Sequence, residues 1–229
     1  NFSIDKAWSS NKLTQQNHLA TYTKISTIPT YKFHTKADFL TAIKNKTLQF
    51  PFIQKIALGC KGKGVSLIHN EKDIASSEEI SKYVYQNYIP NDGDYRVIVL
   101  GGKVLGCIKR IAASKEFRNN LSQGANAEAV TSPSIIKELH TLALRIASAF
   151  NLTFCGIDII YDKKENKYIF LEINSLPEWQ PDSIGFQRVT GVNVAREVLL
   201  YCKSMFQREN KKTPELIKKY FIESENYID

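Results

Sequence analysis

Residues 154–174 read Phe154-Cys-Gly-Ile-Asp158-Ile-Ile-Tyr161, then Asp162-Lys-Lys-Glu-Asn-Lys167, then Tyr168-Ile-Phe-Leu-Glu172-Ile-Asn174. Two apolar runs around a short polar break are typical of an antiparallel hairpin. We expect residues 164–166 to form its loop, with Asn166 in the left-handed conformation that such loops often need. A loop of that length places Asp158 directly opposite Glu172.

Two carboxylates on an otherwise apolar hairpin indicate a bound cation. Like charges directly opposite each other destabilise a sheet, so Asp158 and Glu172 favour a shared positive ion. The alternation of side chains along a strand places Glu172 and Asn174 on one face together with Phe170. Carboxylate and amide oxygens are hard ligands that suit Mg²⁺, especially when substrate phosphates complete the shell. An edge hairpin with one solvated face is the alternative that these residues leave open.

Length and composition indicate a globular protein. A chain of 229 residues can form one large domain or two lobes that share an interface. The sequence contains no apolar run long enough to span a membrane and no visible signal peptide. It begins with Asn1, so we expect that an upstream part is missing. The four cysteines, Cys60, Cys107, Cys155 and Cys202, are widely separated, which argues against zinc and disulfides and predicts a reducing, cytoplasmic location.

The net charge of +8 predicts an anionic partner such as a nucleotide, an acidic peptide or nucleic acid. The lysines are scattered except in residues 207–229, and no nucleic-acid-binding motif occurs among them. A solvated lysine-rich surface accounts for most of them. Nucleic acid is therefore the least favoured of these partners.

A glycine-rich segment, Gly59-Cys-Lys-Gly62-Lys63-Gly64, follows the predicted strand at residues 50–58. Glycine lets backbone N–H groups approach a phosphate closely, and lysine supplies charge. A second strand rather than a helix is predicted to follow, so this is neither a Walker nor a Rossmann loop. A plain hairpin turn is the alternative. Lys55 lies in the apolar strand itself, where a buried lysine is costly unless an anion meets it.

A second hairpin is predicted where residues 95–100 and 103–111 flank Gly101-Gly102. Pairing Leu100 with Lys103 sets Asp94 opposite Lys109 with Arg96 on the same face, and points Arg110 the other way. The charged end of this hairpin forms either a salt-bridged rim or a site for a polyanion, if the glycine-rich segment folds over it.

The remaining elements follow from caps, periodicity and breakers. We predict helices from Ser10 or Asn11 to before Pro29, at residues 36–48, at residues 76–83, from Ser132 or Ser134 to about Phe150, and from Val194 to about Met205. Short strands are predicted at residues 30–33 and 83–90. Residues 117–125 read as an irregular polar segment.

The order of these features resembles the ATP-grasp fold, and within it the RimK-type ligases, which add glutamate or other amino acids to a carboxyl terminus. The resemblance covers residues 11 to about 201. Its motifs are Lys55 in a strand, Gly59-Cys-Lys-Gly-Lys-Gly-Val, Gln86-Asn-Tyr-Ile, Asp94-Tyr-Arg, Ile108-Lys-Arg110, Phe117-Arg-Asn-Asn-Leu, Gly156-Ile-Asp158 and Leu171-Glu-Ile-Asn174. Each motif is weak alone, but eight of them in this order are specific.

The resemblance implies a mixed α/β fold in which two α/β lobes clasp ATP. Residues 1–84 would form the smaller lobe with the glycine-rich lid, and residues 85–206 the lobe that binds nucleotide and metal. Residues 207–229 would be a charged tail. The amino-terminal domain usual in these enzymes would be absent.

Site residues are carried over position by position. Lys12 and Lys55 would contact the ATP phosphates, and Gly62, Lys63 and Gly64 would cover them. Gln86, Asn87, Tyr88 and Ile89 would hold the adenine, and Asp94 would lie at the ribose or its surroundings. Arg110, Arg118, Asn119 and Asn120 would reach the γ-phosphate and an acyl-phosphate, with Arg110 and Arg118 as catalytic residues. Asp158, Glu172 and Asn174 would bind Mg²⁺, with Mn²⁺ as an alternative.

The function implied is that of an ATP- and Mg²⁺-dependent carboxylate–amine ligase. It would add an amino acid such as glutamate to a peptide or small-molecule carboxylate, with an acidic peptide favoured by the charge. A non-catalytic nucleotide-binding scaffold of the same fold is the first alternative, and a nucleic-acid-binding module is the second. Two departures from the family stand out: Asn87 replaces an acidic residue, and residues 175–181 replace a glycine-containing turn, which leaves the acceptor open. A homo-oligomer also remains open.

Overall fold

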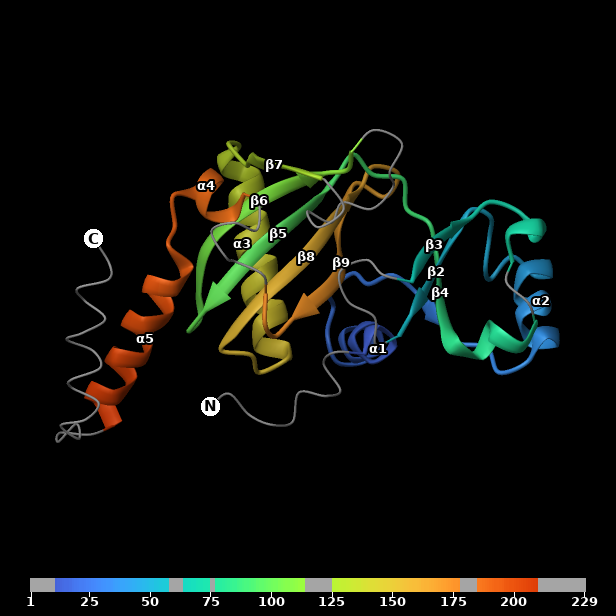
Figure 1. Cartoon of the computed structure of the whole chain (residues 1–229), viewed down its shortest axis with the longest axis horizontal. Helices are drawn as coiled ribbons and strands as arrows, with labels where there is room; N and C mark the ends of the chain where they lie inside the picture. Colours follow the sequence, from blue (N-terminus) through green and yellow to red (C-terminus); the bar gives the residue numbers. More distant parts are fainter. Residues whose placement is uncertain (1–10, 58–63, 75–76, 114–124, 178–184, 210–229) are drawn as a thin grey trace.

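The computed structural model describes residues 11–57, 64–74, 77–113, 125–177 and 185–209, which form two antiparallel sheets (Figure 1). The four-stranded sheet has the order β1 (Thr30–Tyr31), β4 (Tyr83–Asn87), β2 (Phe52–Ile56), β3 (Val65–Ile68). The five-stranded sheet has the order β7 (Asn126–Ala129), β6 (Lys103–Ile111), β5 (Asp94–Leu100), β8 (Phe154–Asp162), β9 (Lys167–Asn174). This arrangement confirms the mixed α/β fold.

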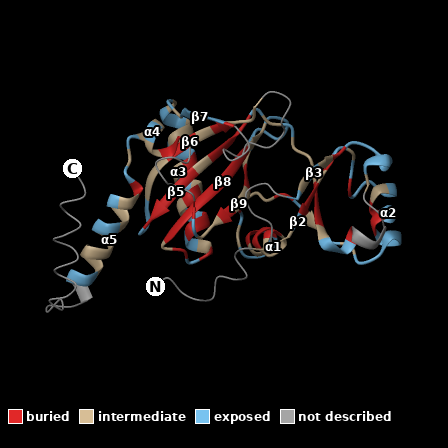
Figure 2. Cartoon of the chain, viewed as in Figure 1, coloured by how far each residue is buried: buried red, intermediate tan, exposed pale blue. Residues whose placement is uncertain are grey.

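The helices cover the sheets or lie at their edges. They are α1 (Lys12–Tyr22), α2 (Lys36–Lys44), α3 (Pro133–Ala149), α4 (Phe186–Thr190) and α5 (Val194–Glu209), with 3-10 turns at Glu71–Asp73 and Ser77–Lys82. Exposed residues gather on α2 and α5 at the two ends of the molecule, whereas the central strands are largely buried (Figure 2). None of the helices in the described ranges has the length and apolar content that crossing a bilayer requires.

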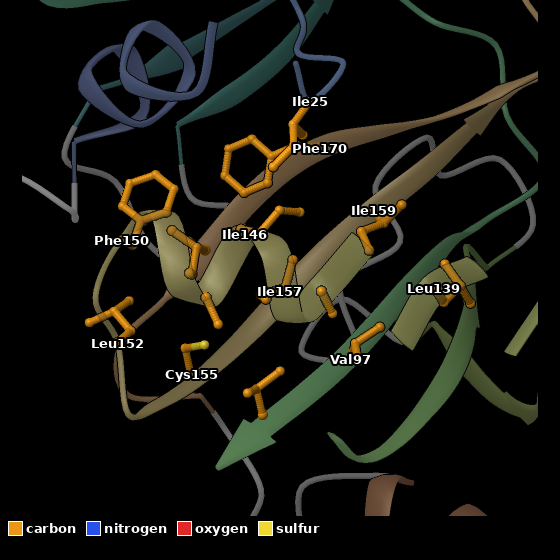
Figure 3. Packing of buried hydrophobic residues seen from close by; sticks show 14 of the residues in the cluster. Ile25, Val97, Leu139, Ile146, Phe150, Leu152, Cys155, Ile157, Ile159 and Phe170 are labelled. Carbon is orange, nitrogen blue, oxygen red and sulfur yellow. The ribbon is translucent and has the colours of Figure 1, made fainter. Parts of the chain in front are cut away.

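Each sheet has its own apolar core. In the larger one, Ile146 of α3 packs with Ile157 of β8 and Phe170 of β9 (Figure 3). The core of the smaller sheet is aromatic and centres on Phe39 and Tyr85, whose ring centroids lie 4.9 Å apart. Burial of such side chains is the main favourable contribution to folding.

Helix α1 belongs by its packing to the larger core, although it precedes the smaller sheet in sequence. Asn11 caps it, as predicted, because Asn11 Oδ1 accepts hydrogen bonds from the backbone of Leu13 and Thr14. Leu19 lies in the core with α3, and the helix runs beside β9 (Figure 1). The chain then passes to β1, so α1 lies where the two sheets approach each other.

Most predicted elements are confirmed with shifted ends. Helix α2 ends at Lys44 rather than at residue 48, because the chain turns at Lys46, which has φ 62°. The helix predicted at residues 76–83 is a 3-10 turn, and the strand predicted to reach residue 90 ends at Asn87. Strand β7 and helix α4 were not predicted.

The hairpin of β8 and β9 confirms that Asp158 lies opposite Glu172, but its loop length and strand register differ from the prediction. Asp162 pairs with Lys167, so the loop has one residue more than predicted. A bulge then follows, in which Leu171 is the extra residue of β9. Asn166 has φ 51°, the predicted left-handed conformation.

The bulge also corrects the predicted face of Phe170. Because one extra residue reverses the alternation of side chains, Phe170 and Ile173 both point into the core beneath α3. Glu172 therefore lies on the opposite face of the sheet from Phe170, and the prediction that the two share a face is wrong.

The hairpin of β5 and β6 contains a second bulge with the same kind of consequence. Leu100 pairs with Lys103 as predicted, but the register shifts between Ile98 and Val99. Asp94 consequently lies opposite Arg110 rather than opposite Lys109. The prediction that Arg110 points away from Asp94 is therefore wrong.

Candidate functional site

Four charged side chains form a connected network across three adjacent strands. Arg110 of β6 donates from Nε to Asp94 Oδ1 at 2.6 Å and from Nη2 to Asp94 Oδ2 at 2.7 Å. Its Nη2 also lies 3.0 Å from Asp158 Oδ2 on β8. Arg96 of β5 holds the same Asp158 from Nε, and from Nη2 at 2.9 Å. Such two-point arginine–carboxylate pairs fix both direction and distance.

Burial and pairing act against each other on these charges. Burial, which opposes the charged form, raises the pKa of Asp94 to about 6, and this leaves Asp94 ionised at neutral pH beside Arg110. Burial also opposes the charge of Asp158, but Arg110 and Arg96 together hold its pKa below the ordinary value. For Arg110, burial is outweighed by Asp158 and Asp94, which raise its pKa. The ion pairs therefore favour the charged forms of Asp158 and Arg110 despite their burial.

A second group of charges lies where α1 meets both sheets. Lys12 Nζ is 3.5 Å from Glu172 Oε2, and the Lys12 backbone N–H donates to the carbonyl of Ala57 just beyond β2. Lys55 of β2 is buried, and this burial lowers its pKa to about 8, with Glu172 acting in the opposite direction and Lys12 in the same direction. Two buried cations thus share one partly exposed carboxylate.

The three predicted metal ligands lie on one face of the β8–β9 hairpin. Asp158 pairs with Glu172, and Gly156 pairs with Asn174, so the side chains of Glu172 and Asn174 lie on the face that carries Asp158. Within the described ranges no three His, Cys, Asp or Glu side chains gather around one point. Two carboxylates and an amide oxygen that share their shell with phosphates fit Mg²⁺ or Mn²⁺.

On strand β4 and just after it, where the adenine is predicted to bind, several polar groups are hydrogen-bonded to neighbouring segments. Gln86 is buried, and its Nε2 donates to Thr30 Oγ1 at 2.6 Å. Asn87 Oδ1 accepts from Gln49 N at 2.8 Å, and the Tyr88 N–H donates to Pro51 O. These three side-chain and backbone groups therefore fix the strand and the turn beside it.

The predicted residue nearest the larger sheet on this segment is Ile89. It packs with Ile28, Ile160, Ile169 and Leu171 in a small apolar cluster between the sheets. Ile89 therefore lies among apolar side chains, and its contact with a purine stays a prediction.

Of the remaining predicted site residues, the structure describes some and not others. Gly62, Lys63, Arg118, Asn119 and Asn120 lie outside the described residues. Gly64 is described: it has φ 68°, and its carbonyl accepts from the Ile56 N–H, which closes the hairpin of β2 and β3. Asp94, predicted at the ribose or its surroundings, directs both carboxylate oxygens to Arg110, and its place at the nucleotide stays a prediction.

Sequence reasoning placed Arg96 at the charged end of the second hairpin but did not name it among the site residues, and it missed Gln15 and Gln16 altogether. Arg96 is two positions from Asp94 on the same strand, and this spacing is the signal that could have placed it in the site. Gln15 and Gln16 are buried in α1 and hydrogen-bond to β9. No local signal marks two glutamines of a helix for such a contact.

Comparison with solved structures shows the same fold. The ATP-grasp ligase PsnB complexed with minimal precursor aligns with a TM-score of 0.62 and 17% identity over 83% of this chain and 58% of that one. The D-alanine–D-alanine ligase of Bacillus anthracis complexed with ATP aligns with a TM-score of 0.61 and 21% identity over 77% and 58% of the two chains. The ATP-grasp fold is thereby confirmed.

Sequence comparison narrows the fold to a family. A probable alpha-L-glutamate ligase of Maridesulfovibrio salexigens is 31% identical over 170 residues, which are 71% of this chain and 54% of that protein. The glutamate–LysW ligase ArgX of Sulfolobus acidocaldarius is 29% identical over 169 residues, 69% and 57% of the two chains. The chain thus spans little more than half the length of these curated relatives. A model of the RimK-like ATP-grasp domain matches residues 4–202, and the chain therefore belongs to the RimK-like ATP-grasp family.

Proposed function

We propose that this chain carries the ATP site of an ATP-dependent carboxylate–amine ligase. The observation that carries the proposal is the placement of Lys12 and Lys55, two buried cations that share Glu172 at the junction of the sheets. Buried cations are costly unless an anion meets them, and a triphosphate is such an anion. The family of the chain supports the same conclusion.

ATP would lie between the two sheets, clasped by the lobes that we propose for residues 1–84 and 85–206. Lys12 and Lys55 would contact the phosphates, and the segment around Gly62, Lys63 and Gly64 would cover them. Residues 86–89 would border the adenine, with Ile89 and its apolar neighbours as the wall. Asp94 would act on the nucleotide only through Arg110, because both of its carboxylate oxygens accept from that residue.

Asp158, Glu172 and Asn174 would hold Mg²⁺, for which Mn²⁺ is an alternative. Their shared face and their oxygen donors suit these ions. When bound, the ion supplies neutralisation of phosphate charge. In the described part of the chain, the site has four cationic side chains (Lys12, Lys55, Arg96, Arg110) and three carboxylates (Asp94, Asp158, Glu172), so we expect a divalent ion to enter with the nucleotide rather than before it.

The chemistry is two successive displacements. A carboxylate oxygen of one substrate attacks the γ-phosphorus, the bond to the β,γ-bridging oxygen breaks, and ADP leaves. The amine of the second substrate attacks the acyl carbon, the carbon–oxygen bond to phosphate breaks, and the amine loses a proton. Arg110 and Arg118 would stabilise charge on the transferring phosphoryl group, and catalysis would rest on positioning. No nucleophilic side chain is needed.

Glutamate is the amino acid we propose for addition, and a peptide is the proposed acceptor. The relatives named above are glutamate ligases, and one of them is named for LysW as its partner. PsnB was solved with a precursor. The charge of +8 favours an acidic peptide by electrostatic attraction.

The test is phosphate release from Mg²⁺-ATP while amino acids and acidic peptides are added one at a time. Release that depends on glutamate and one acceptor, with a matching mass gain on that acceptor, is the expected result. Glu172→Gln should abolish release and leave the fold intact. Tight ATP binding without release across the panel would contradict the ligase and favour a nucleotide-binding scaffold.

A further inference from the structure

At Ile173 the outer edge of β9 is closed by a side chain of α1, whereas at Phe170 it is closed by backbone, because the Phe170 N–H donates to the carbonyl of Ser26 at 3.0 Å. Gln15 of α1 donates from Nε2 to the carbonyl of Ile173 at 2.9 Å, and the Ile173 N–H donates back to Gln15 Oε1 at 3.1 Å. A neighbouring strand makes the same two-way exchange with its partner. The amide of Gln15 therefore takes the place of a strand residue beside Ile173.

Gln16 acts at the bulge of the same strand. Its Nε2 donates to the carbonyl of Leu171 at 2.8 Å and lies 3.4 Å from that of Phe170, while its Oε1 accepts from the Ile28 N–H at 3.0 Å. Leu171 is the extra residue of the β8–β9 register. A buried carbonyl without a partner is costly, and Gln16 supplies the partner where the ladder is interrupted.

The bulge decides which face Glu172 occupies. Without the extra residue, the register at the turn end of the hairpin would place Glu172 opposite Ile157 and turn its carboxylate toward the core beneath α3. The two residues that flank Glu172 are Leu171 and Ile173, and both are bound by α1. Lys12 of the same helix reaches Glu172 itself at 3.5 Å.

We propose that Gln15 and Gln16 are positioning residues that fix the bulge at Leu171, and with it the place of Glu172 opposite Asp158 and beside Lys12. Neither glutamine needs to touch nucleotide or metal for this role. The consequence for ligand binding rests on the proposed function, whereas the consequence for the strand register does not.

The experiment compares Gln15→Met and Gln16→Met with Gln54→Met. Methionine keeps the length of the side chain and removes the amide. Gln54 is also buried, but it lies on the opposite face of β2 from Lys55, so its substitution controls for the loss of a buried amide. Each variant is examined by circular dichroism and thermal unfolding, and then at a temperature where all are folded.

The first readout is Mn²⁺ binding in the presence of ADP, measured by electron paramagnetic resonance. We expect Mn²⁺ affinity to fall about tenfold or more in both α1 variants, as when groups that orient a metal ligand are removed, and to stay within about twofold of wild type in Gln54→Met. Affinity equal to wild type in the α1 variants would overturn the proposal.

The second readout is independent of the ligand. In nuclear magnetic resonance spectra, the Ile173 amide should lose hydrogen-exchange protection in Gln15→Met, and the cross-strand contacts between Asp158 and Glu172 should weaken in Gln16→Met. If wild type binds no Mn²⁺ with ADP, the proposed function fails and this readout still decides the inference. Unchanged pairing would overturn it, and so would unfolding of both α1 variants with Gln54→Met folded, because the amides would then serve folding alone.

Discussion

Arg110 of the five-stranded sheet and Lys55 of the four-stranded sheet are both buried cations, yet their surroundings act on the charge in opposite directions. Arg110 lies within 3.0 Å of Asp94 on the adjacent strand β5 and of Asp158 on β8 beyond it, and the pKa of Arg110 is raised. Lys55 pairs in register with Val65 and Val84 and has its pKa lowered to about 8.

The difference distinguishes a buried charge that is paired within its own sheet from one that is available to a ligand. The larger sheet pairs these charges internally, because Arg110 meets the carboxylates of Asp94 and Asp158 within that sheet. Among the residues that the structure describes, no carboxylate lies beside Lys55 in the smaller sheet, and the acid that raises its pKa is Glu172 from β9. We therefore expect an anion that binds between the sheets to interact most strongly with the ammonium group of Lys55.

Arg110→Met should have the largest effect on stability. It leaves Asp94 and Asp158 buried without the cation they share, and breaking such a pair from one side lowers the free energy of unfolding by about 3–5 kcal/mol. Urea unfolding followed by circular dichroism measures this loss. The double variant Asp94→Asn/Arg110→Met should recover at least about 1 kcal/mol of it, because it removes one of the stranded charges.

Lys109→Met is the matched control for that prediction. Lys109 is the neighbouring residue of the same strand, and its ammonium lies 3.6 Å from the exposed carboxylate of Asp92. An exposed pair of this kind contributes about 0–1 kcal/mol. Similar losses in Arg110→Met and Lys109→Met would show that the internal network does not support the larger sheet.

Lys55→Met should stabilise the protein while it weakens nucleotide binding. At neutral pH Lys55 is charged although burial disfavours this form, and a pKa lowered from 10.5 to about 8 corresponds to a cost of about 3 kcal/mol. We expect the free energy of unfolding to rise by about 1–3 kcal/mol and ADP affinity to fall at least about tenfold. A destabilised variant with unchanged ADP affinity would make Lys55 a structural residue.

The same lysine predicts a pH dependence. Between pH 8 and 10.5 the unfolded chain holds a proton on Lys55 that the folded protein has lost, so this group makes wild type more stable as pH rises. The free energy of unfolding of Lys55→Met should therefore exceed that of wild type by a constant amount below about pH 8. Above pH 8 this difference should decrease by about 1.4 kcal/mol for each pH unit. Urea unfolding of both proteins at pH 7, 8, 9 and 9.5 measures the difference. A constant difference would mean that Lys55 does not titrate in this range.

The two hairpins show how far the sequence predicts such a site. Their turns were predicted because Gly101-Gly102 and Asn166 have conformational preferences that are visible locally. The bulges were not, because Leu105 and Leu171, the extra residues, are apolar like their neighbours. One extra residue exchanges the faces of a strand, which is why Arg110 and Phe170 were assigned to the wrong faces.

Asp158 was nevertheless placed opposite Glu172 correctly, because two errors of one residue cancelled. The loop is one residue longer than predicted, and the bulge at Leu171 restores the register. Gln15 lay beyond prediction for another reason: its partner Ile173 is 158 positions away, and only the tertiary fold brings them together. Strand β7, with the sequence Asn-Ala-Glu-Ala, has little preference for a strand and forms by pairing with β6.

The smallest predicted effect concerns Asn87, which was predicted to contact the adenine and lies at the end of β4. Asn87 Oδ1 accepts from Gln49 N at 2.8 Å, and its Nδ2 donates to Thr47 O at 3.1 Å, so both ends of the amide hold the turn before β2. Asn87→Ala should lower the free energy of unfolding by about 1 kcal/mol, since hydrogen bonds near the surface contribute little each. ADP affinity, measured by calorimetry, should change less than about twofold.

Asn45→Ala is the control for this variant, because Asn45 Oδ1 holds the same turn through Thr47 N at 3.1 Å without involving β4. The two variants should resemble each other in stability and in ADP affinity. If Asn87→Ala alone loses ADP affinity about tenfold, its amide must leave the turn to meet the base. The smaller sheet would then contribute two polar groups to the nucleotide, Lys55 at the phosphates and Asn87 at the adenine, and the contrast with the self-contained larger sheet would become sharper.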